Sequence, residues 1–307
     1  SHRPQRDGSM STTIDTAFIR QYESEVHAVF QRQGGYLRPT VRTKDNVRGT
    51  STTFQKIGKG VATTKARHGV ITPMNQVHTA ITATLSDFYA GDWVDKLDEA
   101  KINIDERMAI ATGGAWALGR KVDDQILTAL DGTTQTAVTW TYTSLHQVEN
   151  SLISTLRELD ELDVPNDGQR FVVLSPQAYA AATKVDSFRS SDFVSPDNKT
   201  MEQGAPIFTW RRWMNALFTA HTGLSGVGTA AAKGFAYHRN STGYATGMNA
   251  GGVIGNAAVS ADITWHGDRA AHFVNHMMSG GAALIDDTGA LELTLDDTAA
   301  LPLIATT

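Results

Sequence analysis

The chain has 307 residues, of which 41% are hydrophobic and 19% charged, a balance typical of a folded protein and not of a disordered one. The formal net charge of −5 argues against a surface devoted to nucleic acid, and the absence of cysteine excludes disulfides, thiolate metal sites and cysteine nucleophiles. No run of about 18 apolar residues predicts a membrane span, so no membrane partner is expected.

Residues 1–9, SHRPQRDGS, precede Met10 and are interpreted as an expression leader, with a processed end as the alternative. Residues 16–32 carry apolar side chains at helical spacing, and the pair Gly34–Gly35 ends this pattern. We therefore expect residues 10–40 to form an N-terminal arm that contains a helix.

The stretch over residues 41–69 is rich in threonine and glycine and runs against the acidic balance of the chain. Against a single carboxylate, Asp45, it carries the basic residues Arg42, Lys44, Arg48, Lys56, Lys59, Lys65 and Arg67, together with His68. The phosphate-loop pattern fails here, because Thr53 stands where it needs glycine and Gly60 where it needs Ser or Thr. Three interpretations remain: a solvated loop, a nucleic-acid arm, or a projecting loop that pairs with acidic surfaces of a neighbouring copy.

Gly58-Lys59-Gly60 predicts a hairpin turn inside this stretch, between extended arms over residues 50–57 and 60–69. The arms contain few large apolar residues, so they cannot form a core of their own. Because an isolated two-stranded ribbon is marginal in water, we expect another surface to stabilise it.

The longest periodic segment runs from Asp95 to Leu130, where apolar residues recur every three or four positions from Ile104 through Ala115 to Ile126. It predicts one long helix. Glycines at 113, 114 and 119 fall inside it, and a mid-helix glycine costs about 1 kcal/mol relative to alanine. These glycines indicate close packing or a bend.

The remaining chain predicts a mixed α+β fold. Residues 144–162 form a second helical pattern with Ser144 as its N-cap. The segment FVVLSP then predicts a strand followed by a helix, which Ser175 caps and Pro176 begins. From Lys233 onward, four extended segments separated by glycine and aspartate turns predict a β-rich C-terminal region.

The motifs of common enzyme classes are incomplete. Asp287-Thr288-Gly289 occurs once, where an aspartic protease needs two copies, and a turn is the favoured interpretation. His272 and His276 lack the adjacent glutamate of a zinc-protease helix and lie in an extended pattern. Gly226-Val227-Gly228 lacks the acidic residue of a dinucleotide site, and Ser225 lacks the second glycine of a nucleophile elbow. We predict no catalytic, metal or cofactor site, and a structural role instead.

Three stretches carry a resemblance to a known family. They are FYAGDWVDKLDEAKINIDERMAIATGGAWALGRKVDDQILTAL, RFVVLSPQAY, and the C-terminal GFAYHRNSTGYATG … GGAALIDDTGALEL. In these stretches and in the order of its elements, the chain resembles a tailed-bacteriophage major capsid protein with the Hong Kong 97-type fold, from Met10 to the last residue.

The resemblance implies a division of the chain. Residues 41–78 are expected to form an extended loop over a neighbouring subunit, and residues 142–227 an axial domain. Residues 79–141 and 228–307 are expected to form a peripheral domain with a spine helix over 95–130. The loop contacts are then Arg42, Lys44, Arg48, Lys56, Lys59, Lys65 and Arg67, with Asp95, Asp98, Glu99, Asp105 and Glu106 as acidic partners.

The same resemblance implies self-assembly through hexamers and pentamers into an icosahedral shell that encloses double-stranded DNA through non-specific contacts. The expected location is the virion capsid, with the host cytoplasm as the place of assembly. Portal, scaffolding and decoration proteins are the other expected partners, and scaffolding is expected to be a separate protein. The alternative is an encapsulin-type nanocompartment shell that encloses cargo enzymes.

Overall fold

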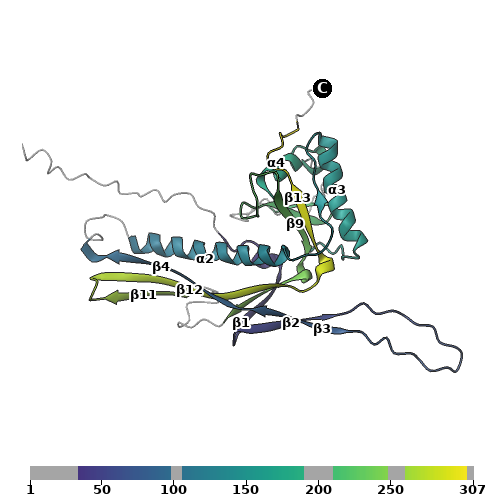
Figure 1. The fold of residues 1–307 in the computed structure, drawn as a ribbon, viewed down its shortest axis with the longest axis horizontal. Coiled ribbons are helices and arrows are strands. Elements are labelled where there is room, and N and C mark those ends of the chain that lie inside the picture. The colour runs from purple at the N-terminus through teal and green to yellow at the C-terminus, as the bar shows by residue number, and fades with distance from the viewer. Residues whose placement is uncertain (1–33, 98–105, 190–209, 248–259, 303–307) are drawn as a thin grey trace, which may run out of the picture.

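The computed structural model describes residues 34–97, 106–189, 210–247 and 260–302 and has an α+β fold in two parts (Figure 1). An elongated part holds the longest helix beside a five-stranded sheet, and a second part, built on a six-stranded sheet, stands at one end of it. A two-stranded ribbon projects from the junction of the two parts and continues into a long open loop. The predicted α+β class is confirmed.

The elongated part combines segments from both ends of the chain. Its elements are β1 (Arg42–Val47), β4 (Ser86–Asp95), α2 (Glu106–Leu130), β10 (Thr242–Gly247), β11 (Ser260–His266) and β12 (Ala271–Leu284). The strands follow the order β1-β10-β12-β11, and β4 also pairs with β12. Leu118, Val122 and Ile126 of α2 are buried as their spacing predicts and share a core with Met278 of β12, whereas Ala115 is exposed.

The first residue of the predicted long helix lies in a strand. Asp95 is the last residue of β4, because the ten residues of this strand pair along β12 up to the pair Asp95–Ala271. The prediction of a helix from Asp95 is therefore wrong for Asp95 itself, whereas Lys96 and Leu97 are helical and α2 is described from Glu106. The helix predicted over residues 16–32 lies outside the described residues.

Close packing explains two of the helix glycines. A Cβ atom on Gly34 would lie 1.9 Å from the backbone of Gly119, so the chain crosses α2 at van der Waals contact of the two backbones. A Cβ atom on Gly114 would lie 2.6 Å from Nδ1 of the His276 ring on β12. The close-packing interpretation is confirmed for Gly114 and Gly119.

A buried carboxylate fixes the same crossing. Asp123 of α2 is fully buried and accepts hydrogen bonds from the N–H of Gly35 (3.1 Å) and of Leu37 (3.0 Å). Nε2 of His221, which is also buried, lies 3.5 Å from the same carboxylate. The chain therefore enters the elongated part through a contact built on α2.

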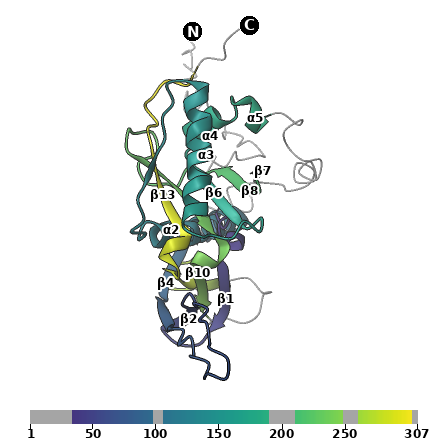
Figure 2. The same ribbon diagram turned by 90° about the vertical axis from the view of Figure 1, so that its right-hand side faces the viewer.

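The second part is a sheet covered by helices. Its strands follow the order β5-β13-β9-β6-β8-β7. They are β5 (Val138–Thr139), β6 (Arg170–Leu174), β7 (Arg211–Trp213), β8 (Ala216–Ala220), β9 (Ala232–His238) and β13 (Ala290–Leu295). The helices are α3 (Leu145–Glu161), α4 (Pro176–Ala182) and α5 (Asp186–Arg189). Figure 2 shows α3 running along this part, with β13 and β6 beside it.

The predicted helix–strand–helix unit is confirmed. The Ser144 hydroxyl accepts a hydrogen bond from the N–H of Gln147 at the start of α3, and the Ser175 hydroxyl accepts one from the N–H of Ala178 at the start of α4. Leu152 and Leu159 of α3 are buried with residues of β6 in one hydrophobic core. The four extended segments predicted after Lys233 are β9, β11, β12 and β13.

Candidate assembly interface

The projecting ribbon pairs β2 (Ser51–Ile57) with β3 (His78–Thr84) in antiparallel register. The hydrogen bond from the N–H of Gly58 to the carbonyl of Val77 (2.8 Å) extends this ladder by one step. The predicted turn at Gly58–Gly60 is therefore wrong. Ala83 of β3 is buried in one small core with Phe54 of β2, so the ribbon forms between these two strands. The chain reverses near the far end of the open loop.

We call residues 60–77 the loop tip. Every residue in it except Gly69 is exposed. The chain reverses at Ala66–Gly69, where the N–H of Gly69 donates to the carbonyl of Ala66 (2.9 Å) and His68 adopts a φ of 68°. Five large apolar side chains are among the exposed residues: Val61, Val70, Ile71, Met74 and Val77. An exposed apolar group of this size on a projecting loop indicates a contact surface.

The base of the ribbon is attached to its own chain. Phe54, together with Ala83, packs into a small core with Ala245 and Ile285, and its ring lies against Gly243, where a Cβ would approach to 2.7 Å. This contact supplies the support that the thin ribbon was expected to need.

Two lysines that were predicted to contact a neighbouring copy form ion pairs within their own chain. Nζ of Lys56 lies 2.6 Å from Oδ1 of Asp286, and Nζ of Lys59 lies 2.5 Å from Oδ2 of Asp163. The hydrogen bond and charge of Lys59 lower the pKa of Asp163. Partial burial disfavours the charged form of Asp286, but hydrogen bonds from Lys56 and Thr288 still lower its pKa. These two lysines therefore hold the base of the loop.

The other predicted basic contacts divide into two groups. Arg42 and Lys44 lie on β1, with the guanidinium of Arg42 5.9 Å from the centre of the Phe54 ring and Nζ of Lys44 3.4 Å from the carbonyl of Thr53. Arg48, Lys65 and Arg67 are exposed. Lys65 and Arg67 form no ion pair with any residue that the structure describes. The free positive charge of the loop is thus near its end.

The predicted acidic partners lie in the elongated part or outside the described residues. Asp95 is exposed at the end of β4 and accepts a hydrogen bond from the N–H of Leu97 (2.7 Å). Glu106 is the first residue of α2. Asp98, Glu99 and Asp105 lie outside the described residues.

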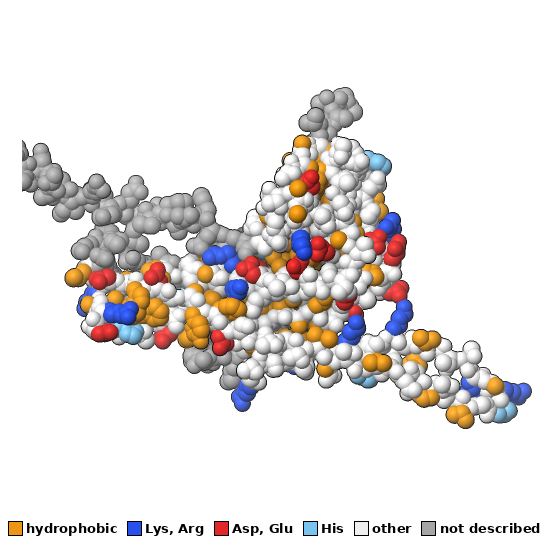
Figure 3. All heavy atoms as spheres, viewed as in Figure 1, with side chains coloured by type: hydrophobic (Ala, Val, Ile, Leu, Met, Phe, Trp, Pro, Cys, Tyr) orange, Lys and Arg blue, Asp and Glu red, His pale blue; other side chains and the backbone are white. Residues whose placement is uncertain are grey.

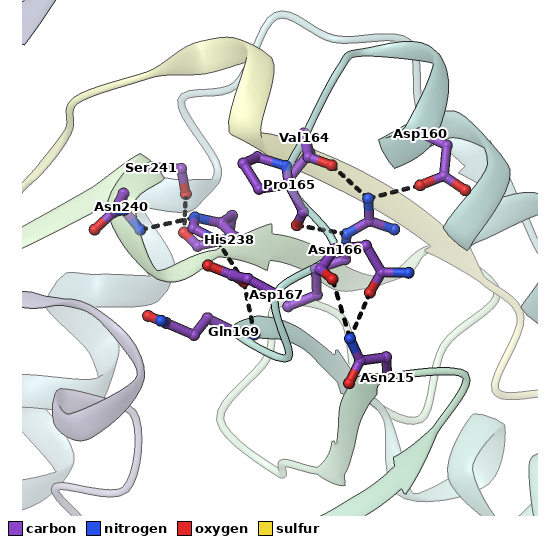
Figure 4. Close-up of polar contacts among 11 residues, drawn as sticks. Asp160, Val164, Pro165, Asn166, Asp167, Gln169, Asn215, His238, Asn240 and Ser241 are labelled. Carbon is purple, nitrogen blue, oxygen red and sulfur yellow. Dashed lines mark hydrogen bonds and ion pairs between the residues drawn. The ribbon is translucent and has the colours of Figure 1, made fainter.

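The turn after α3, which carries Asp163, is held by a network of hydrogen bonds (Figure 4). The buried guanidinium of Arg170 donates to Oδ1 of Asp160 (2.6 Å) and to the carbonyls of Val164 and Pro165. Nε2 of His238 lies 3.1 Å from Oδ1 of Asp167. Because this turn is fixed to β6 and β9, the Lys59–Asp163 pair joins the loop to a rigid point of the second part.

Asp287 has a structural role. Its carboxylate accepts hydrogen bonds from the hydroxyls of Thr133 (2.8 Å) and Thr134 (2.5 Å), the N–H of Thr134 (2.9 Å) and the side-chain amide of Gln135 (2.8 Å). Burial opposes the charged form, but these bonds lower the pKa of Asp287 to about 2. Such a carboxylate stays charged and fixed, so the turn interpretation of Asp287–Gly289 is confirmed.

The other motifs also have structural explanations. His272 and His276 lie on strand β12, as expected, and His276 is buried against α2. Residues Gly226–Gly228 form a turn that the N–H of Gly228 ties to Asp297 (2.9 Å). In the described part of the chain, no three His, Asp or Glu side chains converge as metal ligands, and no helix is long and apolar enough to cross a membrane.

A pocket of about 810 Å³ opens between the segment Trp140–Leu145 and the residues Ala299–Pro302. Its lining is apolar apart from hydroxyl groups and Asp296, which gives no pairing of acid, base and nucleophile.

The fold is that of capsid subunits in solved bacteriophage structures. The chain is similar to the capsid structure of the cyanophage P-SCSP1u, with 13% identity and a TM-score of 0.66 over 92% of this chain and 94% of that one. It is similar to a structure of Mycobacterium phage Che8 (16%, 0.63, 92% and 98%) and to the capsid of the Myoviridae phage XM1 (15%, 0.61, 94% and 99%). No curated protein matches the sequence.

Residues 14–297 match the model of the phage capsid protein family, and the chain belongs to this family. The prediction of a bacteriophage major capsid protein is thereby confirmed. The family is one of structural proteins and not an enzyme class, and its members work in the virion capsid together with other copies.

The feature that sequence reasoning missed is the apolar character of the loop tip. Between residues 41 and 69 the basic residues dominate and large apolar side chains are few. The signal was the run of Val70, Ile71, Met74 and Val77 just beyond it, which lies outside any helical or strand pattern.

Proposed function

We propose that the chain assembles through hexamers and pentamers into an icosahedral shell that encloses double-stranded DNA. In this arrangement residues 41–78 act as the extended loop and residues 142–227 as the axial domain. Residues 79–141 and 228–307 act as the peripheral domain, with α2 as its spine helix. The observation that carries the proposal is the loop tip, which extends away from the body of its own chain and exposes large apolar residues.

The loop contacts a neighbouring copy. Lys65 and Arg67 are suited to ion pairs with a neighbour, because they are exposed and have no acidic partner among the described residues. Lys56 and Lys59 act within the chain and set the direction of the loop. Arg42, Lys44 and Arg48 lie nearer the body, where they complete the contact zone at the base.

The proposed shell also has other proteins and DNA as partners. Scaffolding, portal and decoration proteins act on the assembled copies, and packaged DNA contacts the shell non-specifically. Assembly takes place in the host cytoplasm. The match to the phage capsid family favours this shell over the nanocompartment alternative.

Electron microscopy of the purified full-length chain tests the proposal. Closed shells, or hexamers and pentamers, are expected. Small soluble species at every concentration contradict it.

Charge reversal refines the test. Reversing Lys56, Lys59 and Lys65 together is expected to impair assembly, but this variant also breaks two ion pairs within the chain. Reversing Lys65 and Arg67 alone leaves those pairs intact and isolates the contact between copies. The double variant is expected to stay folded, as circular dichroism can show, and to assemble poorly. Normal shells from the double variant would show that Lys65 and Arg67 are not part of the contact between copies.

A further inference from the structure

A buried histidine and a buried carboxylate meet where the two parts of the chain join. His221 directly follows β8 of the second part, Asp123 lies on α2, and both side chains are fully buried. Nε2 of His221 lies 3.5 Å from Oδ2 of Asp123. The same carboxylate accepts the N–H groups of Gly35 and Leu37. The histidine ring therefore contacts the group that fixes the entering chain to α2.

The hydrogen bond on the other ring nitrogen fixes the tautomer of His221. Nδ1 accepts the N–H of Gly223 (3.1 Å), and a ring nitrogen that accepts a hydrogen bond carries no proton. The ring is therefore uncharged, and its proton is on Nε2, facing Asp123. A second proton can bind only at Nδ1, where it would face the N–H of Gly223 as donor against donor. Protonation of His221 therefore breaks this hydrogen bond.

The turn that follows His221 is rich in glycine and is anchored by a leucine. Residues 221–228 contain three glycines, two of which adopt positive φ values of 73° and 83°. Leu224 is buried in the core that α2 and Leu37 share. A glycine-rich backbone has several conformations of similar energy. Loss of the Gly223 hydrogen bond can therefore rearrange the turn and displace Leu224 from this core.

The described ionisable groups around the pair keep their charge states near neutral pH. Burial raises the pKa of the Tyr244 phenol to about 12, with the charge of Arg38 opposing this shift and that of Asp123 adding to it. Burial also raises the pKa of Tyr237. Hydrogen bonds, the largest from a threonine, lower the pKa of Asp45, so it stays charged. Histidine is the side chain whose ordinary titration falls between pH 5 and 8, so the buried ring is the group here that changes charge in that range.

The exposed side of the junction does not titrate in the same range. Figure 3 shows basic, acidic and hydrophobic side chains together where the second part stands on the elongated part. Nζ of Lys233 on β9 lies 2.5 Å from Oδ1 of Asp131, directly after α2, and 3.1 Å from Oε2 of Glu292. Lysine and carboxylate groups at the surface keep their charges between pH 5 and 8. These pairs therefore hold the parts together equally at both ends of that range.

We propose that His221 is a pH-sensitive contact between the two parts of the chain. As the pH falls from about 7.5 to about 5.5, Nδ1 takes up a proton from solvent, the Gly223 hydrogen bond breaks, and the turn releases Leu224 from the core on α2. The charge of Asp123 favours the protonated ring, so proton uptake and the change of the turn occur together. This property belongs to the single chain and does not depend on shell assembly.

Hydrogen exchange followed by mass spectrometry tests this contact on the purified full-length chain. Exchange is measured at about pH 7.5 and about pH 5.5, and each rate is divided by the intrinsic chemical rate at that pH. Light scattering checks that the oligomeric state is the same at both. The test variant is His221→Gln. Its amide oxygen can still accept the N–H of Gly223 and its amide nitrogen can still face Asp123, but glutamine takes up no proton.

The matched control is His238→Gln. Nδ1 of His238 accepts the N–H of Asn240 (3.2 Å), and Nε2 lies 3.1 Å from Oδ1 of Asp167 (Figure 4). The pattern of partners is the same as that of His221, but the carboxylate belongs to the turn before β6 and not to α2.

In the wild type, the corrected exchange of residues 221–228 is expected to rise roughly tenfold at the lower pH, because one proton shifts an equilibrium by up to about tenfold per pH unit. The rise should disappear in His221→Gln and persist in His238→Gln. Equal exchange of the wild-type turn at both pH values, or a rise that persists in His221→Gln, overturns the proposal and leaves the proposed function untouched.

A pH series on the wild type alone covers the case in which His221→Gln does not fold. The rise is expected to have its midpoint between about pH 5 and 7, where histidine titrates. A midpoint below about pH 5 would assign the change to a carboxylate and would also overturn the proposal.

Discussion

Nζ of Lys56 on β2 lies 2.6 Å from Oδ1 of Asp286, a residue of the turn between β12 and β13. With the pair Lys59–Asp163 it gives the projecting ribbon two ionic attachments to its own chain. The base of the loop is thus fixed by charge, while its end exposes apolar groups to solvent. The base of the loop therefore sets the direction in which the loop projects, and the tip is the part that can bind a neighbour.

Lys56→Glu tests the first attachment. Both partners are about one third exposed, so the pair contributes no more than about 1 kcal/mol to the free energy of unfolding. We expect a small decrease in the free energy of unfolding, measured by chemical denaturation. We expect a larger increase in the protease sensitivity of the ribbon. The swap Lys56→Glu with Asp286→Lys should recover much of both, and a swap that recovers neither would show that the pair does not hold the ribbon.

Asp287 predicts a pH dependence of stability. Its pKa in the folded chain is lowered to about 2 from an ordinary value near 3.8. The contribution of its hydrogen bonds is therefore complete above about pH 4 and is lost as the pH falls from about 4 to 2. Asp287→Asn should lower stability at pH 7 by about 1–3 kcal/mol. Below pH 3 the difference between the variant and the wild type should shrink, and a difference that stays constant with pH would contradict this role.

Removing the Asp123 carboxylate is expected to destabilise the contact between residues 35–37 and α2. In Asp123→Ala the N–H groups of Gly35 and Leu37 lose their acceptor, at a cost of about 1–3 kcal/mol for buried donors left without a partner. Hydrogen exchange followed by mass spectrometry should show faster exchange in the peptide around Leu37. Half-buried Asp124 is a poor control because it has other contacts, so the better comparison is Asp92→Ala on β4, an exposed residue whose carboxylate accepts the N–H of its neighbour Trp93 (2.8 Å).

Gly34→Ala tests the backbone crossing. The added methyl group would lie 1.9 Å from the backbone of Gly119, and backbone atoms cannot rotate away as a side chain can. Overpacking of this kind costs about 1–3 kcal/mol, and the chain should unfold at lower denaturant concentration. Gly132→Ala, whose new Cβ would meet one carbonyl at 3.3 Å, is the milder comparison. Equal stability of the two variants would contradict the close crossing.

The sequence predicted the parts of the fold that depend on local patterns. Ser144 and Ser175 cap helices because a hydroxyl before a helical stretch meets free N–H groups, whatever the tertiary context. The glycines of α2 indicated close packing without naming its partner. Gly34 and His276 come from distant parts of the chain, and no local pattern connects them to α2.

Two errors arose where long-range pairing overrode a local signal. Gly58-Lys59-Gly60 has the composition of a turn, but Gly58 joins the ladder because Val77 stands opposite it. Asp95 continues an apparent helical period, but β12 holds it in a strand. The candidate site was found by its charge, whereas the ion pairs of Lys56 and Lys59 and the exposure of Val70 depend on the folded chain.

The central claim is that copies of this chain form a closed shell in which each loop reaches a neighbour. Electron cryo-microscopy of particles assembled from the purified chain tests it most directly. The prediction is an icosahedral shell in which density for residues 60–77 lies on an adjacent subunit. Particles in which these residues fold back on their own chain, or a protein that remains monomeric under all assembly conditions, would contradict it.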